Sequence, residues 1–217
     1  MELVWHGHAF FTLRLANGYV ISIDPHDGLS IGLKRVRVES DLVLVTHDHF
    51  DHNAVEVVKK PSTRILKQFY GEVRVDDVVI NGIKTFHDKH GGARRGENAV
   101  YIVDAEGLKI AHLGDLGHVP SGEVLNKMSK IDVLMIPVGG TYTIEPDEAW
   151  SIVENLGPRI VVPMHYWVKG LRLPLKTVDH FLKYAEKVRV DKLNTNLVSI
   201  TPSNLPSETT VIVFKYS

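Results

Sequence analysis

The chain contains no cysteine, which limits both how it can be stabilised and how it can hold a metal. Disulfide bonds, thiolate metal sites and a cysteine nucleophile are all excluded. Histidine, aspartate and glutamate remain as the strong metal ligands.

Long apolar runs and an excess of charge of one sign are also missing. No run approaches the roughly 20 apolar residues of a transmembrane helix. Residues 1–6 lack the basic region and apolar core of a secretory signal. With 25 basic and 26 acidic residues, the chain has no basic footprint for a polyanion. We therefore expect a cytoplasmic protein with no membrane span and no dedicated nucleic-acid binding.

The composition is that of an ordinary globular protein. Hydrophobic residues make up 44% of the 217 residues and charged residues 24%, both close to average values. A chain of this length can bury one large core. We expect a single domain over residues 1–217.

The most informative stretch is Thr-His-Asp-His-Phe-Asp-His at residues 46–52, which holds three imidazoles and two carboxylates. Before it, residues 41–45 form an apolar run that predicts a buried strand. After it, residues 53–60 are expected to begin a helix that stops at Pro61. The cluster therefore lies at the end of a strand, a usual place for a site in an α/β sheet.

The spacing within this stretch indicates two groups of metal ligands. His47 and His49 are two residues apart and share a face in extended backbone. The following turn can direct Asp51 and His52 at a second point nearby. Imidazoles and carboxylates suit zinc and similar divalent ions. The alternative is a polar surface turn that happens to contain histidines, and three of them in six positions beside a buried strand argue against it.

Several other elements can be predicted from local patterns. Asn17-Gly18 predicts a hairpin between strands at residues 10–15 and 19–23, and residues 98–103 and 108–113 predict a second hairpin. Residues 34–37 read as a solvated edge strand. Helices are expected over residues 120–128, 146–155 and 177–188.

The motif His47-x-His49-x-Asp51-His52 resembles the signature of the metallo-β-lactamase superfamily. Residues 2–166 more narrowly resemble its zinc-dependent hydrolases related to ascorbate-phosphate lactonases and N-acyl-phosphatidylethanolamine phospholipases. The resemblance implies an α+β fold, an αββα sandwich. Two mixed β-sheets would pack face to face, with helices on the outer faces, around one or two metal ions.

The resemblance also implies the remaining ligands. His87 follows the expected strand 83–86, as the third ligand of the first ion does in the family, with His90 and His112 as alternatives. His112 lies three residues before Asp115, an odd offset that favours opposite faces of a strand. Asp115 matches the carboxylate that bridges both ions; its alternative role is to cap a helix. The implied set is His47, His49 and His87 for one ion, Asp51, His52 and His165 for the other, and Asp115 between them.

Residues around the ligands are expected to support them or to bind substrate. Asp24 matches a carboxylate that orients a ligand histidine, although it could simply cap a turn. Arg94 and Arg95 follow His87 in a glycine-rich loop, where a guanidinium could bind phosphate or be a solvated charge. His8 and His118 are expected at the rim of the site, or else as histidines without a role in it.

We therefore predict a hydrolase with two divalent metal ions, zinc foremost, with manganese or iron as alternatives. Hydroxide bridging the ions would attack a small anionic ester, phosphodiester or lactone. The candidates for proton transfer are, in order of preference, Asp51, His90, Tyr142 and His118. A metal-dependent nuclease is disfavoured by the near-neutral charge. A non-catalytic metal-binding protein is disfavoured because every ligand position is filled.

Overall fold

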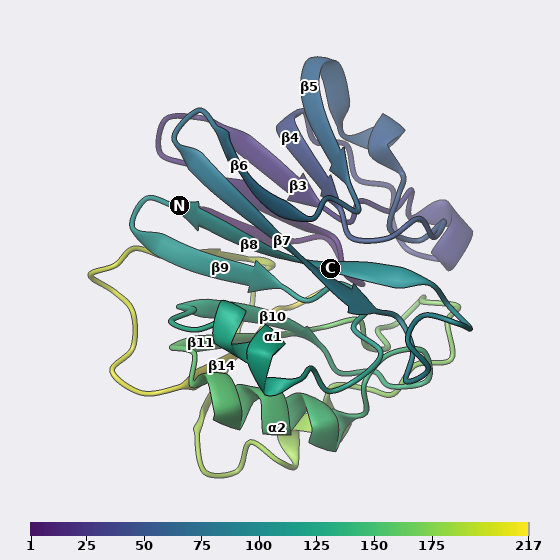
Figure 1. Cartoon of the computed structure of the whole chain (residues 1–217), viewed down its shortest axis with the longest axis vertical. Helices are drawn as coiled ribbons and strands as arrows, with labels where there is room; N and C mark the ends of the chain where they lie inside the picture. Colours follow the sequence, from purple (N-terminus) through teal and green to yellow (C-terminus); the bar gives the residue numbers. More distant parts are fainter. Residues whose placement is uncertain (217) are drawn as a thin grey trace.

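The computed structural model describes residues 1–216, which form two mixed β-sheets packed face to face (Figure 1). The six-stranded sheet has the order β13-β1-β2-β3-β4-β5. Its strands are β1 (Glu2–Trp5), β2 (Phe11–Arg14), β3 (Val20–Ile23), β4 (Ser40–Val45), β5 (Lys59–Lys67) and β13 (Leu197–Ser199). The pairing is antiparallel from β13 to β3 and parallel from β3 to β5. The predicted hairpin at Asn17-Gly18 joins β2 to β3 and is confirmed.

The eight-stranded sheet has the order β12-β14-β11-β10-β9-β8-β7-β6. Its strands are β6 (Gly71–Val75), β7 (Val78–Phe86), β8 (Glu97–Ala105), β9 (Leu108–His112), β10 (Val133–Pro137), β11 (Ile160–Met164), β12 (Arg189–Lys192) and β14 (Thr210–Val213). It is antiparallel from β6 to β9 and parallel from β9 to β12. The expected fold, with two mixed sheets, is confirmed.

One apolar core fills the space between the sheets. In β2, β3 and β4 alternate residues point into it, among them Phe11, Ile21 and Leu42. Every residue of β10 and β11 is buried. A strand that is covered on both faces reads as a continuous apolar run, which is why these two strands can be predicted from the sequence.

Helices are few and lie in connections of the eight-stranded sheet. They are α1 (Gly122–Lys127), α2 (Pro146–Leu156) and α3 (Asp179–Leu182). In Figure 1, α1 and α2 lie beside β10, β11 and β14, away from β3, β4 and β5. The outer face of the six-stranded sheet is covered instead by an irregular segment and the 3₁₀ helix η2 (Val55–Val57), whose valines pack on Phe10, Val43, Val45 and Val58. A second 3₁₀ helix, η1, spans Leu29–Ile31.

Three of the predicted elements are wrong. Residues 53–60 form only η2 and then enter β5, which contains Pro61. Proline is tolerated because β5 is an edge strand whose register with β4 shifts between Lys59 and Arg64. The helix over 177–188 is reduced to α3, and residues 34–37 are irregular rather than a strand.

Candidate metal centre

Buried polar side chains gather where the strands end. Asp24 follows β3, Thr46 and His47 follow β4, and His87 follows β7. Asp115 lies three residues beyond β9, and His165 directly follows β11. Because these ends meet at one side of the sandwich, residues distant in the sequence come within contact distance.

The first group of possible ligands is His47, His49 and His87, whose donor atoms lie within 4.8 Å of one another. His47 and His87 are buried and His49 is half-buried. Burial holds the pKa of His47 well below its usual value, and a neutral imidazole is the form that binds a metal. The structure therefore brings together the three histidines predicted for one ion.

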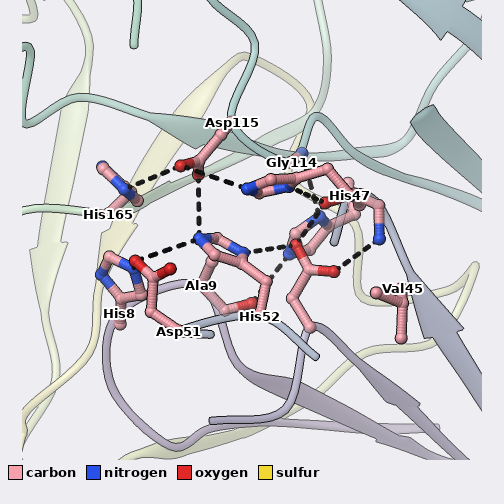
Figure 2. Close-up of polar contacts among 12 residues, drawn as sticks. His8, Ala9, Val45, His47, Asp51, His52, Gly114, Asp115 and His165 are labelled. Carbon is pink, nitrogen blue, oxygen red and sulfur yellow. Dashed lines mark hydrogen bonds and ion pairs between the residues drawn. The ribbon is translucent and has the colours of Figure 1, made fainter. Parts of the chain in front are cut away.

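The second group is Asp51, His52 and His165, joined by His8, again within 4.8 Å. Asp115 lies between the two groups, and its Oδ2 is 3.2 Å from Nε2 of both His87 and His165. Its Oδ1 is 3.3 Å from Nε2 of His52. Figure 2 shows the contacts that Asp115 makes with both groups. One carboxylate thus faces donors of both groups.

The unpaired atoms of the site fit a bound cation. Within residues 1–216, Nε2 of His47, His52 and His165 and Oδ1 of Asp115 are buried without a hydrogen-bond partner. Buried polar atoms are normally paired, and imidazole and carboxylate donors suit divalent metals. Burial lowers the pKa of His52, but the carboxylates of Asp115, Asp24 and Asp51 outweigh burial and raise that pKa well above its usual value. The same carboxylates would attract a metal cation.

Asp24 lies behind the proposed ligands and contacts Thr46 and His52. It accepts hydrogen bonds from Thr46 N–H at 2.8 Å and from the Thr46 hydroxyl at 2.7 Å. Its Oδ2 also lies 2.9 Å from Nδ1 of His52. Both oxygens are engaged in these contacts, and a donor atom of Asp24 also lies within 4.8 Å of donors of His47 and His52; its role of orienting His52 stays a prediction.

His8 does not lie at the rim, where the sequence suggested it. It is fully buried, and its Nε2 is 3.1 Å from Oδ2 of Asp51. Burial, and after it the neighbouring His165, lowers the pKa of His8 to about 3, so the neutral ring can donate its N–H to Asp51. The buried environment explains the error, since a histidine in a glycine-containing turn gives no local sign of burial.

A cavity of about 320 Å³ opens beside the two groups of donors. It is lined by His49, Phe50, Asp51, His87, Arg95, Asp115, Tyr142 and Leu173. Three residues predicted to act on substrate (Asp51, Tyr142 and Arg95) therefore reach it.

Four other candidates do not line this cavity. His90 and Arg94 are exposed. His118 accepts a hydrogen bond from Phe86 N–H at Nε2, 3.3 Å away. His112 is buried, with Nε2 2.9 Å from the Ala9 carbonyl oxygen. His90, Arg94 and His118 therefore do not reach this cavity, and their expected roles toward substrate stay predictions; His112 belongs to neither group of donors.

The loop that carries Arg95 is held by Asp88. The Asp88 carboxylate accepts four backbone N–H groups, those of His90, Gly92, Arg94 and Arg95, at 2.7–3.0 Å. The Arg95 guanidinium then lies over the Tyr142 ring, with 4.2 Å between Cζ and the ring centroid. No carboxylate within residues 1–216 forms an ion pair with Arg95.

Comparison with known proteins agrees with this fold. Residues 2–165 match the family described as the beta-lactamase superfamily domain, and the chain belongs to this superfamily. It is 34% identical over 185 residues to a UPF0173 metal-dependent hydrolase of Thermococcus onnurineus, covering 74% of this chain and 82% of that one. A UPF0173 metal-dependent hydrolase of Methanoculleus marisnigri is 30% identical over 216 residues, covering 89% of this chain and 94% of the relative. Within the superfamily, the chain is a member of the UPF0173 metal-dependent hydrolases.

A solved structure of the same superfamily has a similar fold. A Thermotoga maritima protein assigned to the zinc-dependent hydrolases of the metallo-β-lactamase superfamily superposes with a TM-score of 0.79. It is 34% identical, and the match covers 99% of both chains. None of the helices within residues 1–216 has both the length and the apolarity needed to cross a bilayer.

Proposed function

We propose that this metal-dependent hydrolase cleaves a small anionic ester, phosphodiester or lactone with two divalent ions, zinc foremost and manganese or iron as alternatives. The position of Asp115 carries the proposal. Its Oδ2 lies at the same 3.2 Å from a nitrogen of each donor group, as a carboxylate serving two ions would.

The donors divide between the ions according to the two groups. His47, His49 and His87 would hold one ion, and Asp51, His52 and His165 the other, with Asp115 shared. Divalent ions held there supply Lewis acidity, which makes water nucleophilic near neutral pH and stabilises negative charge on the substrate.

The remaining steps can be assigned to side chains of the cavity. Burial raises the pKa of Asp51, but His52 and His8 outweigh burial and hold it well below its usual value, so Asp51 is an ionised proton acceptor. His8 engages one lone pair of Oδ2 of Asp51, so Asp51 can hold the ion through one oxygen and take a proton from the attacking water at the other. The Tyr142 hydroxyl is the donor for the leaving oxygen. The exposed His90 lies away from the cavity lining, and we give it no role.

A small substrate suits the cavity better than a nucleic acid does. About 320 Å³ is at the lower end of the range for small-molecule sites, and the net charge is −1. The expected cytoplasmic location remains a prediction.

Metal analysis and a substrate panel test the proposal. Protein dialysed against zinc or manganese should contain up to two ions per chain by mass spectrometry. It should hydrolyse bis(p-nitrophenyl) phosphate or members of a lactone panel, lose this activity on chelation and regain it on reloading. The absence of a tight metal site would overturn the proposal. Two bound ions without turnover of any anionic substrate would favour a non-catalytic metal-binding protein.

Arg95 should select for the anionic group of the substrate. Arg95→Ala removes one charge-assisted contact made in both ground and transition states. It should raise KM for bis(p-nitrophenyl) phosphate with little change in kcat. A loss of about 1.5–3 kcal/mol corresponds to roughly ten- to a hundredfold in kcat/KM. Arg94→Ala is the matched control, because Arg94 is exposed outside the cavity lining. An equal loss of kcat/KM on a neutral ester would show that Arg95 does not bind the anionic group and is a solvated charge of the loop.

A further inference from the structure

An exposed aromatic side chain lies among the proposed ligands. Phe50 stands between His49 and Asp51, and it lines the same cavity as they do. It is 59% exposed, the highest value among the large apolar side chains exposed in residues 1–216. Leu29, Ile65, Val119, Trp167 and Tyr184 are the others, and none of them lines this cavity. Exposed apolar surface inside a binding cavity is a feature of sites that take apolar groups.

Leu173 forms a second apolar wall of the cavity. It is half-buried and packs on a separate apolar cluster formed by Ile31, Leu33, Leu171 and Leu175. The wall is also fixed through the backbone, because Thr141 donates its hydroxyl hydrogen bond to the Pro174 carbonyl at 2.8 Å. The loop that presents Leu173 is thereby tied to the loop that presents Tyr142. The cavity thus has an apolar wall that is supported from behind.

The polar part of the same cavity is cationic. The Arg95 guanidinium lies over the Tyr142 ring, and no carboxylate of residues 1–216 pairs with it, so its N–H groups can donate to a ligand. The cavity therefore presents three surfaces of different chemistry. These are the donors of the proposed metal centre, the cation of Arg95, and the apolar surface of Phe50 and Leu173.

We infer that the ligand of this site is an amphiphilic anion: an anionic group that faces Arg95 and the metal donors, joined to a short alkyl or aryl group that contacts Phe50 and Leu173. The inference rests on the proposed function for the anionic end and adds the apolar end. The volume of about 320 Å³ limits the apolar part to a short chain or a single ring.

Binding of a series of alkylphosphonates tests this inference without depending on turnover. Methyl-, propyl- and hexylphosphonate are titrated by calorimetry into the zinc-loaded protein. Full burial of a methylene is worth about 0.8 kcal/mol, close to fourfold in affinity, and walls that remain partly exposed should give about two- to fourfold for each methylene. In Phe50→Ser and in Leu173→Ser, the increase in affinity with chain length should fall, while the affinity for methylphosphonate should stay near the wild-type value.

Two further variants separate the apolar end from the anionic end. Leu29→Ser is the matched control, because Leu29 is 56% exposed but lies outside the cavity lining, and it should leave the increase with chain length unchanged. Arg95→Ala should weaken the binding of all three phosphonates by a similar factor.

The outcomes distinguish this inference from the proposed function. Equal affinity for the three phosphonates in the wild type would overturn the apolar subsite and leave the anion site standing. A wild-type increase with chain length that persists in both serine variants would also overturn it. If none of the phosphonates binds, the proposed function fails, and this inference fails with it.

Discussion

Replacing Asp24 by asparagine should weaken the binding of one metal ion without removing any of the proposed ligands. The Asp24 carboxylate accepts from the Thr46 hydroxyl and lies 2.9 Å from Nδ1 of His52, which holds the proton of the ring on Nδ1 and leaves Nε2 for the ion. An amide group would offer an N–H where Oδ2 now lies. His52 would then accept at Nδ1 and carry its proton on Nε2, the tautomer that cannot bind a metal there.

The size of this effect follows from the hydrogen bond between the Asp24 carboxylate and His52. A hydrogen bond to a charged group contributes about 1.5–3 kcal/mol. Removing a carboxylate from behind a ligand histidine typically costs about 10–100-fold in metal affinity. These ranges agree, because tenfold corresponds to about 1.4 kcal/mol. We therefore expect the ion held with His52 to bind about 10–100-fold more weakly. The affinity for the ion held by His47, His49 and His87 should change less.

The assay is a zinc titration of metal-free protein against a competing chelator, fitted with two dissociation constants. Asp41→Asn is the control, since Asp41 also accepts a backbone N–H, that of Val20 at 2.9 Å, but near the start of β4, at the end opposite to Thr46 and His47. If Asp24→Asn leaves both constants at their wild-type values, the reasoning about the tautomer is refuted. Equal weakening in the Asp41 variant would show a general loss of stability instead.

Three further predictions concern metal linkage, ligand choice and pH. Chelation should clearly lower the melting temperature, since metal bound only by the folded state contributes about 4 kcal/mol at a thousandfold excess over Kd; an unchanged melting curve after verified removal would contradict this. His87→Ala should lose one zinc ion and activity, whereas His112→Ala should mainly reduce stability; wild-type zinc content in His87→Ala would move the ligand assignment elsewhere. Burial is the main cause that lowers the pKa of His6 from 6.5 to about 3, followed by His26 and Arg14. The neutral His6 ring therefore contributes stability to the folded state that is present above pH 6.5 and is lost as the pH falls towards 3. The slope is at most about 1.4 kcal/mol per pH unit; urea unfolding of chelated protein at pH 7 and 4.5 should show a smaller difference for His6→Gln than for the wild type, and an equal difference would refute the assignment.

The fold could be predicted where the local pattern and the final environment agree. β10 and β11 are apolar throughout because both of their faces are covered, and α2 has proline in its first turn and a reciprocal capping box between Glu145 and Glu148. Residues 53–60 and 177–188 show the opposite case. In the first stretch, residues 59 and 60 enter β5, which pairs with β4. The second stretch is helical only over α3 and continues through turns to β12, which pairs with β14. Such pairing depends on residues far away in the sequence, so no local pattern reveals it.

The candidate site divides in the same way. The motif at residues 46–52 could be found because three histidines, a scarce residue type, follow an apolar run, whereas His87, Asp115 and His165 are implied by the family resemblance. The positions of His8 and Leu173 could not be found. His8 joins the donors only because the turn between β1 and β2 folds over β11, where His165 N–H donates to the His8 carbonyl at 3.1 Å. Leu173 reaches the cavity only through the apolar cluster beneath its loop.

The backbone of the site indicates why folding and metal binding should be linked. His8, Asp24 and His165 have φ values of 53°, 48° and 50°, in the left-handed region that residues other than glycine rarely adopt. Each such residue costs of order 1 kcal/mol or more. Asp51 and Asp115 add buried like charges at the same place. These costs fall on the folded state whether or not a cation is present, whereas the attraction of a cation to the carboxylates is gained only in the folded state. A bound cation would therefore offset strain and charge repulsion together, so the loops that carry Asp24, Asp51 and His165 should be the first part of the molecule to loosen when metal is removed. Amide hydrogen exchange of metal-loaded and chelated protein can locate this change, and equal exchange at these loops in both forms would show that the strain is held by packing alone.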